Sequence, residues 1–259
     1  MTCSIHARGL SYRYPSGHPA LDKVELRVEH GERVAVLGPN GAGKTTLMLH
    51  LGGLLLGVGE LEVAGVKARR GRLPELRRRV GLVFQDPDDQ LFMPTVEEDV
   101  AFGPLNLGLG AEEARERVGE ALAAVGMAGA ERRAPHQLSM GERRRVAIAT
   151  VLAMRPALLV LDEPSANLDP RGRRELLEVL SALDRTLVVV THDLPLAAAL
   201  CERVVVLDRG SVVADGPSAE VLADPELLAA HDLELPDGFD LAAVRRLPRA
   251  GDGVHAPLR

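Results

Sequence analysis

The chain has 259 residues, of which 46% are hydrophobic and 26% are charged, and this composition excludes a disordered protein. The formal net charge of −6 argues against general nucleic-acid binding, because contacts with phosphates need a positive field. No run reaches the roughly 18 apolar residues of a membrane helix, so we expect any link to a membrane to come through a partner. Two arginine runs, 77–79 and 143–145, each fit either a local basic patch or the solvated face of a helix.

The first part of the chain has the pattern of an α/β fold. Val24, Leu26 and Val28 alternate with charged residues, which predicts a strand with one buried face. Residues 33–37 form a short apolar run that leads into a glycine-rich loop, and residues 44–51 have the pattern of a helix. A strand, a glycine-rich loop and a helix in this order open an α/β nucleotide-binding fold.

The glycine-rich loop has the P-loop pattern GxxxxGK[ST] in Gly38-Pro39-Asn40-Gly41-Ala42-Gly43-Lys44-Thr45. Its glycines let successive N–H groups point at an anion, and the start of the following helix adds partial positive charge. We expect Lys44 to reach the β- and γ-phosphates of ATP, Thr45 to ligate Mg²⁺ and Thr46 to approach the α-phosphate. This pattern alone defines a P-loop NTPase, a group that includes kinases, GTPases and motors.

Later segments predict the rest of an α/β domain whose sheet is covered on both faces. Short apolar runs at residues 80–84, 158–161, 187–190 and 204–207 are typical of buried strands in a largely parallel sheet. The stretch from about residue 95 to 155 is predicted to be a helical insert. Within it Thr95 and Glu98 form a capping box, and a helix at 111–125 ends at Gly126. We place the main domain at 1–231 and a partly disordered extension at 232–259, with a short helix near 241–247.

Two adjacent carboxylates follow the apolar run at 158–161. Asp162, at the end of the predicted strand, is placed to assist in binding Mg²⁺. Glu163 is one residue further on and so points in a different direction, which suits a base that orients the attacking water. An ordinary strand exit with solvated charges would give the same pair of residues. The P-loop earlier in the chain favours the catalytic interpretation.

Leu138-Ser139-Met140-Gly141-Glu142 resembles the signature of ATP-binding-cassette (ABC) ATPases, usually Leu-Ser-Gly-Gly-Gln, and residues 143–149 resemble its continuation. The resemblance implies that Ser139 and Gly141 bind the γ-phosphate of the ATP held by the opposite subunit. Ser139 and Glu142 also form a capping box at a helix start, and the two interpretations are compatible. Met140 and Glu142 depart from the usual residues, but Ser139 and Gly141 are intact, so we expect hydrolysis to survive.

The remaining ABC motifs follow in the family's order, and the resemblance covers about residues 4–225. It implies that Gln85 is the Q-loop glutamine near Mg²⁺ and the water, and that Asp169 belongs to the D-loop, which crosses a dimer interface. His192 resembles the switch histidine that bonds the γ-phosphate. Tyr14 matches the aromatic residue that stacks on adenine, with Tyr12 as the alternative. The implied fold is a cassette with a mostly parallel core sheet, an antiparallel β subdomain and a helical insert.

Within the family the chain resembles the ATPases of energy-coupling-factor importers, particularly the cobalt/nickel branch. The segments that carry this resemblance are 83–92, 95–108, 149–156 and 233–236. It implies an ATPase that uses ATP and Mg²⁺ as a homodimer, or as a heterodimer with a paralogous ATPase. Transmembrane transporter subunits would hold it at the cytoplasmic side of the cell membrane. The implied cargo is cobalt or nickel, and a vitamin or another micronutrient is the alternative.

Two other classes of protein are alternatives to a transport ATPase. A soluble ABC protein of DNA repair or translation usually carries a long coiled coil or two cassettes in one chain, and this sequence has neither. A small-molecule P-loop kinase would leave Ser139 to Glu142 and His192 without a role.

Overall fold

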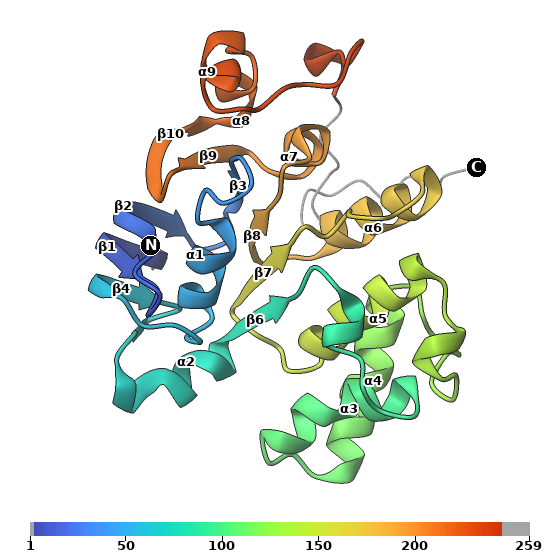
Figure 1. Ribbon diagram of the computed structural model, residues 1–259. Coiled ribbons are helices and arrows are strands. Elements are labelled where there is room, and N and C mark those ends of the chain that lie inside the picture. The colour runs from blue at the N-terminus through green and yellow to red at the C-terminus, as the bar shows by residue number, and fades with distance from the viewer. Residues whose placement is uncertain (1–2, 245–259) are drawn as a thin grey trace.

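The computed structural model describes residues 3–244, which form two sheets flanked by helices (Figure 1). The larger sheet has six strands in the order β10-β9-β3-β8-β7-β6, and all neighbours are parallel except β10 and β9. Its strands are β3 (Arg33–Leu37), β6 (Val80–Val83), β7 (Leu158–Asp162), β8 (Thr186–Val190), β9 (Arg203–Asp208) and β10 (Ser211–Pro217). The mostly parallel sheet expected from the sequence is therefore confirmed.

The smaller sheet is antiparallel, with the order β2-β1-β4-β5. Its strands are β1 (Cys3–Arg13), β2 (Pro19–Glu29), β4 (Val58–Val63) and β5 (Val66–Lys67). This sheet is the expected antiparallel subdomain.

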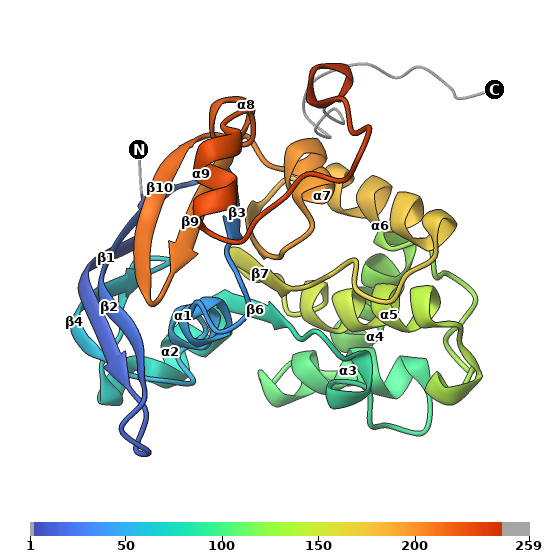
Figure 2. The same cartoon turned by 45° about the horizontal axis from the view of Figure 1, so that its top comes forward.

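The helices divide between the two sides of the larger sheet. They are α1 (Lys44–Leu51), α2 (Leu73–Arg79), α3 (Val96–Asn106), α4 (Ala111–Ala124), α5 (Met140–Leu152), α6 (Pro170–Ala182), α7 (Leu194–Leu200), α8 (Ser218–Val221) and α9 (Pro225–Ala230). Short 3₁₀ turns are η1 (Arg70–Arg72), η2 (Pro87–Asp89), η3 (Pro135–Gln137) and η4 (Leu241–Ala243). Both views place α3, α4 and α5 beyond β6, on the side of the molecule opposite to the antiparallel sheet (Figures 1 and 2).

The central strands are buried on both faces, which explains their uninterrupted apolar runs. In β3, Ala35 and Leu37 join a core with α3 to α7, whereas Val34 and Val36 join a second core with α1, α2 and the antiparallel sheet. Successive side chains of a strand point to opposite faces, so a strand between two cores is apolar on both faces. The buried polar residues of these strands lie at their ends, and they are Arg33, Asp162 and Thr186.

Local signals placed several helix ends correctly. Thr95 and Glu98 form the predicted capping box of α3. Gly126 has φ 68° and follows α4, where Met127 N–H donates to Leu122 O at 2.8 Å, so this helix ends in a Schellman motif.

The helix predicted near 241–247 is wrong over its described part, because only the 3₁₀ turn η4 forms there. The carboxylate of Asp240 accepts the N–H groups of Ala242 and Ala243, which favours a local turn, and Val244 is extended. Residues 245–247 lie outside the described part of the chain. Before that point, apolar side chains of the predicted extension pack on the core that contains α3 to α7, and they are Leu233, Leu235, Phe239, Leu241 and Val244.

Candidate nucleotide-binding site

The carboxyl ends of four parallel strands carry the predicted site residues. The P-loop follows β3, His192 follows β8, Asp162 and Glu163 lie at the end of β7, and Gln85 follows β6. These strands are neighbours in the sheet. Because the ends of parallel strands meet at one edge, residues far apart in sequence come together there.

The P-loop needs glycine at two of its positions. Gly38 has φ 150° and Gly43 has φ 105°. A Cβ atom would collide with the carbonyl oxygen of Leu207 at Gly38 and with that of Ala20 at Gly43. Residues with a Cβ atom rarely adopt this conformation and do not fit the space, so the loop can curve only with glycine there.

Lys44 is buried at the start of α1 and turns back into the loop. Its Nζ donates to the carbonyl oxygens of Gly38 at 2.7 Å and Pro39 at 2.9 Å. Burial lowers the pKa of Lys44, and the nearby carboxylates of Glu163 and Asp162 oppose this fall. The ammonium group is thus held at the loop by two carbonyl oxygens.

Asp162 and Thr45 form a cluster of oxygen atoms beside Lys44. The Thr45 hydroxyl donates to Asp162 Oδ2 at 3.3 Å, and both residues line one pocket with Gln85. Burial raises the pKa of Asp162, and the hydrogen bond from Thr45 opposes this rise. Hydroxyl, carboxylate and amide oxygens are the ligands that Mg²⁺ prefers, so these donors fit that ion.

Glu163 is held by the loop that follows β8. Its backbone has φ 42°, a strained value for a residue with a side chain. Its Oε2 accepts the Thr191 hydroxyl at 2.8 Å, and its Oε1 accepts the His192 N–H at 3.0 Å. His192 Nδ1 lies 2.7 Å from the same Oε1, while the imidazole side chain is 67% exposed. The structure therefore brings the two predicted catalytic residues into contact.

A single pocket at this edge gathers most of the predicted nucleotide contacts. The predicted residues that line it are Tyr14, Asn40, Gly41, Gly43, Lys44, Thr45, Thr46, Gln85, Asp162 and Glu163. Gly38, Pro39 and Ala42 shape the loop behind it, and Ala42 is buried. Of the two tyrosines, Tyr14 lines the pocket, whereas Tyr12 packs on the core.

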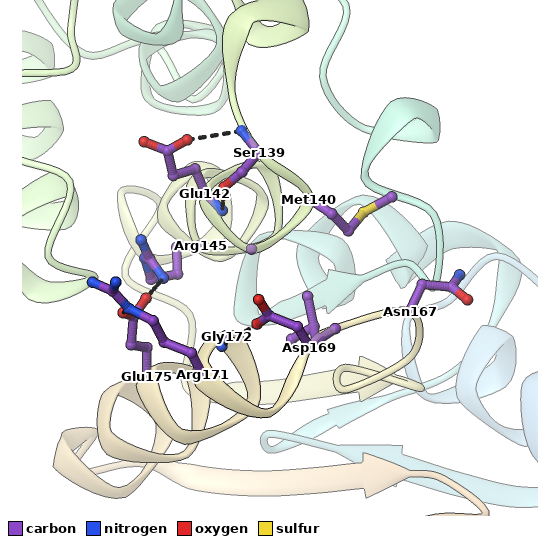
Figure 3. Close-up of a pocket in the computed structure, with 11 residues that line it drawn as sticks. Ser139, Met140, Glu142, Arg145, Asn167, Asp169, Arg171, Gly172 and Glu175 are labelled. Carbon is purple, nitrogen blue, oxygen red and sulfur yellow. Dashed lines mark hydrogen bonds and ion pairs between the residues drawn. The ribbon is translucent and has the colours of Figure 1, made fainter.

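The predicted signature and D-loop residues line a different pocket (Figure 3). Ser139, Gly141 and Asp169 lie there, at the starts of α5 and α6. Ser139 caps α5, and Asp169 caps α6 by accepting the Gly172 N–H. The two pockets share no lining residue. Ser139, Gly141 and Asp169 thus line a pocket separate from that of the P-loop. A further pocket shares Thr45, Gln85 and Asp162 with the P-loop pocket and Met140 and Asn167 with the other.

The arginine run 143–145 is neither a basic patch nor a solvated face. Arg143 pairs with Asp88 at 2.8 Å, and Arg145 pairs with Glu175. Arg144 is 1% exposed, and its guanidinium donates to Phe84 O at 2.9 Å and Ala166 O at 3.4 Å.

Arg144 therefore joins the segment before Gln85 to the loop before Asp169, a connection that sequence reasoning missed. A signal was present, because Ile148 and Val151 follow Arg144 at the i+4 and i+7 spacing of one buried helix face.

Known proteins are similar to this chain in sequence over most of their length. A sequence profile of the family described as ABC transporter matches residues 21–166. The energy-coupling factor transporter ATP-binding protein EcfA of Methanothermobacter thermautotrophicus is 50% identical over 98% of this chain and 83% of its own length. The cobalt import ATP-binding protein CbiO of Rhodobacter capsulatus is 48% identical over 100% of this chain and 98% of its own length.

Solved structures agree with the sequence comparisons. CbiO1 of Clostridium perfringens, described as part of the transporter complex cbiONQ, superposes with a TM-score of 0.80 at 37% identity, covering 91% of this chain and 97% of its own. The cassette MJ0796, solved as a dimer bound to ADP and phosphate, has a TM-score of 0.73 at 30% identity, covering 83% of this chain and 98% of its own.

The P-loop after β3, the carboxylates at the end of β7 and the capped start of α5 define a P-loop NTPase of the cassette class. Such proteins bind ATP and hydrolyse it. The chain belongs to the ABC transporter family, and within it to the ATP-binding subunits of energy-coupling-factor importers.

Proposed function

We propose that this ATPase drives the import of cobalt or nickel ions by hydrolysing ATP at an interface between two cassettes. The observation that carries the proposal of two cassettes is the division of the site. The P-loop, Asp162 and Glu163 line one pocket, and Ser139, Gly141 and Asp169 line another. A second copy facing the first would supply the missing half of each site, as a homodimer or with a paralogous ATPase.

Within each site the nucleotide would lie along the pocket that the P-loop lines. Tyr14 would stack on the base, the backbone N–H groups from Asn40 to Thr46 would hold the phosphates, and Lys44 would reach the β- and γ-phosphates. Thr45, Asp162 and Gln85 supply oxygen atoms that suit Mg²⁺, which neutralises phosphate charge when bound. Ser139 and Gly141 of the second copy would approach the γ-phosphate.

Glu163 would orient the attacking water, and His192 would contact the γ-phosphate. The Thr191 hydroxyl and the His192 N–H fix both oxygens of the Glu163 carboxylate. Each carboxylate oxygen has more than one lone pair, so the group can accept a water proton without giving up these bonds.

The membrane subunits would bind at α3, beside the Gln85 loop. Phe92, Phe102 and Leu105 are exposed large hydrophobic residues, and the rings of Phe92 and Phe102 meet edge to face at 4.9 Å. Phe102 and Leu105 line a largely apolar groove between α3 and α4. Exposed apolar surface of this kind is typical of protein or membrane interaction sites. Among residues 3–244 the structure has no helix of the length and apolarity needed to span a bilayer.

Cobalt as the cargo is supported by the name of the CbiO relative, and nickel rests on the resemblance of the sequence to the cobalt/nickel branch. A vitamin or another micronutrient is the alternative, and a soluble ABC ATPase outside transport is a further one. The cargo would bind a membrane subunit, with this chain on the cytoplasmic side.

Co-expression with the products of neighbouring genes tests the proposal. We expect the ATPase to fractionate with membranes and to support metal-ion uptake in reconstituted vesicles. Phe102→Glu should release it from membranes and leave ATP binding intact. Val58→Glu is the matched control, because Val58 is also exposed but belongs to the antiparallel sheet. A monomeric, fully active ATPase that never joins membranes would refute the transport role.

A further inference from the structure

Four residues form a closed ring of contacts beneath the proposed base-binding position, and one of these contacts is to the backbone carbonyl of Thr46. The Tyr14 hydroxyl lies 3.0 Å from Thr46 Oγ1, and His50 Nδ1 lies 2.7 Å from the carbonyl oxygen of Thr46. The His50 ring meets Tyr12 edge to face at 4.8 Å, and Tyr12 meets Tyr14 in the same way at 5.1 Å. The ring connects α1, which carries the phosphate-binding residues, to the end of β1 and the loop after it.

His50 is a polar residue at a fully buried position, where an aliphatic residue would suffice for packing alone. It is 0% exposed, and burial lowers its pKa, which favours the neutral imidazole. A carbonyl oxygen can only accept, so Nδ1 carries the proton and Nε2 is left as an acceptor. Nε2 has no hydrogen-bond partner among the described residues. A buried, unpaired acceptor costs stability, and an aliphatic residue would avoid that cost.

Tyr14 lies in a loop that offers it little other support. The loop connects β1 to β2, and residues 15–19 are exposed. Backbone bonds close it from Tyr14 N to His18 O at 2.9 Å and from Gly17 N to Tyr14 O at 2.8 Å, but they do not fix a side chain. The Tyr12 ring contacts the body of the Tyr14 ring, and Thr46 contacts its hydroxyl. Two contacts at different points of one ring fix its plane.

We infer that Tyr12 and His50 are positioning residues that hold the ring of Tyr14 in place to stack on the nucleotide base. They would set the affinity for the base, while the P-loop sets the affinity for the phosphates. This inference rests on the proposed role of Tyr14. Tyr12 and His50 would act through Tyr14 and would not themselves touch the nucleotide.

The test compares a nucleotide with a ligand that lacks a base. Calorimetry on the full chain measures the affinity for MgATP and for magnesium tripolyphosphate. Tyr12→Leu should weaken MgATP binding about three- to tenfold, the range expected for loss of an aromatic edge contact, and leave tripolyphosphate binding unchanged. In turnover assays it should raise the KM for ATP without changing kcat. Tyr12→Phe is the matched control, because it keeps the ring, and should behave as the wild type.

His50 gives a second, independent pair of variants. His50→Leu removes both the ring and the bond to Thr46, so it should weaken MgATP binding in the same selective way. His50→Phe restores a ring against Tyr12 and should recover part of the loss. If Tyr12→Leu does not fold, this pair decides the outcome.

Two results would overturn the inference. Equal losses for MgATP and tripolyphosphate would mean that Tyr12 and His50 only stabilise the fold, and unchanged MgATP affinity would mean that Tyr14 needs no support. Tyr14→Ala tests the proposed role of Tyr14 separately from the positioning role of Tyr12 and His50. If Tyr14→Ala does not reduce the difference in affinity between MgATP and tripolyphosphate, the proposed stacking by Tyr14 is wrong. If Tyr14→Ala reduces this difference but Tyr12→Leu does not, only the positioning role is wrong.

Discussion

The start of α5 contains an ion pair whose contribution can be measured. Glu142 Oε2 accepts the Ser139 N–H at 2.7 Å, and Oε1 accepts Arg133 Nη1 at 2.7 Å (Figure 3 shows the Ser139 bond). The hydrogen bond from Arg133 is the main cause that lowers the pKa of Glu142 to about 2. Glu142→Gln would keep the capping bond, because a glutamine oxygen can accept the same N–H, and would lose the ion pair.

The pKa of Glu142 and the exposure of the two side chains set the expected loss in the free energy of unfolding. A fall of the pKa from 4.5 to about 2 corresponds to about 3 kcal/mol if all of it stabilised the folded state. The side chains of Arg133 and Glu142 are 41% and 25% exposed, so screening by solvent reduces the expected contribution to about 1 kcal/mol.

The sign of the pH dependence follows from the lowered pKa. A carboxyl group whose pKa is depressed on folding stabilises the protein above its unfolded pKa, here 4.5. That stability is lost as the pH falls from there towards about 2. The pair should therefore contribute fully at neutral pH and progressively less below pH 4.5.

A double-mutant cycle isolates the pair. Urea unfolding of the wild type, Glu142→Gln, Arg133→Met and the double variant at neutral pH should give a coupling free energy of about 1 kcal/mol. Repeating the cycle at about pH 3.5, within the range where the carboxyl group takes up its proton, should give a smaller value. Additive effects of the two substitutions, or a coupling free energy that does not change with pH, would refute the reasoning.

Three further substitutions address the two halves of the site. Glu163→Gln should nearly abolish turnover but retain ATP and trap a dimer, as seen by gel filtration with ATP; unimpaired hydrolysis would contradict its role as the base. Ser139→Arg should block ATPase activity by filling the γ-phosphate position of the facing copy, and full activity would argue against a shared site. Gly43→Ala should lower the free energy of unfolding by about 1–3 kcal/mol, because the φ of 105° at Gly43 disfavours any residue with a Cβ atom and the carbonyl oxygen of Ala20 occupies the space of that atom. An unchanged midpoint of urea unfolding would contradict this expected destabilisation.

Features that depend on short segments could be predicted from the sequence. The P-loop curves because of its glycines, which can be read directly from residue types and spacing. The strands of the parallel sheet were predicted to within a residue or two, since burial on both faces leaves an uninterrupted apolar run. The capping boxes at Thr95 and Ser139 are local in the same sense.

Specific side-chain pairings, and contacts between distant segments, could not be predicted in this way. Nothing near Glu142 in the sequence selects Arg133, which reaches it from the loop before η3. Arg144 stands within a run of three arginines, and only the packing of α5 decides which of the three is buried. The ring of Tyr12, Tyr14, Thr46 and His50 likewise depends on how β1 crosses α1.

The burial of Arg144 has a mechanical consequence. Its guanidinium is bonded to main-chain carbonyl oxygens of two loops that leave neighbouring strands, β6 and β7. Breaking these bonds would leave the buried guanidinium without its carbonyl acceptors, which is costly. If α5 rotated against the sheet, both loops would therefore be dragged with it. A movement of α5 would thus be transmitted to both the Gln85 and the Asp169 segments.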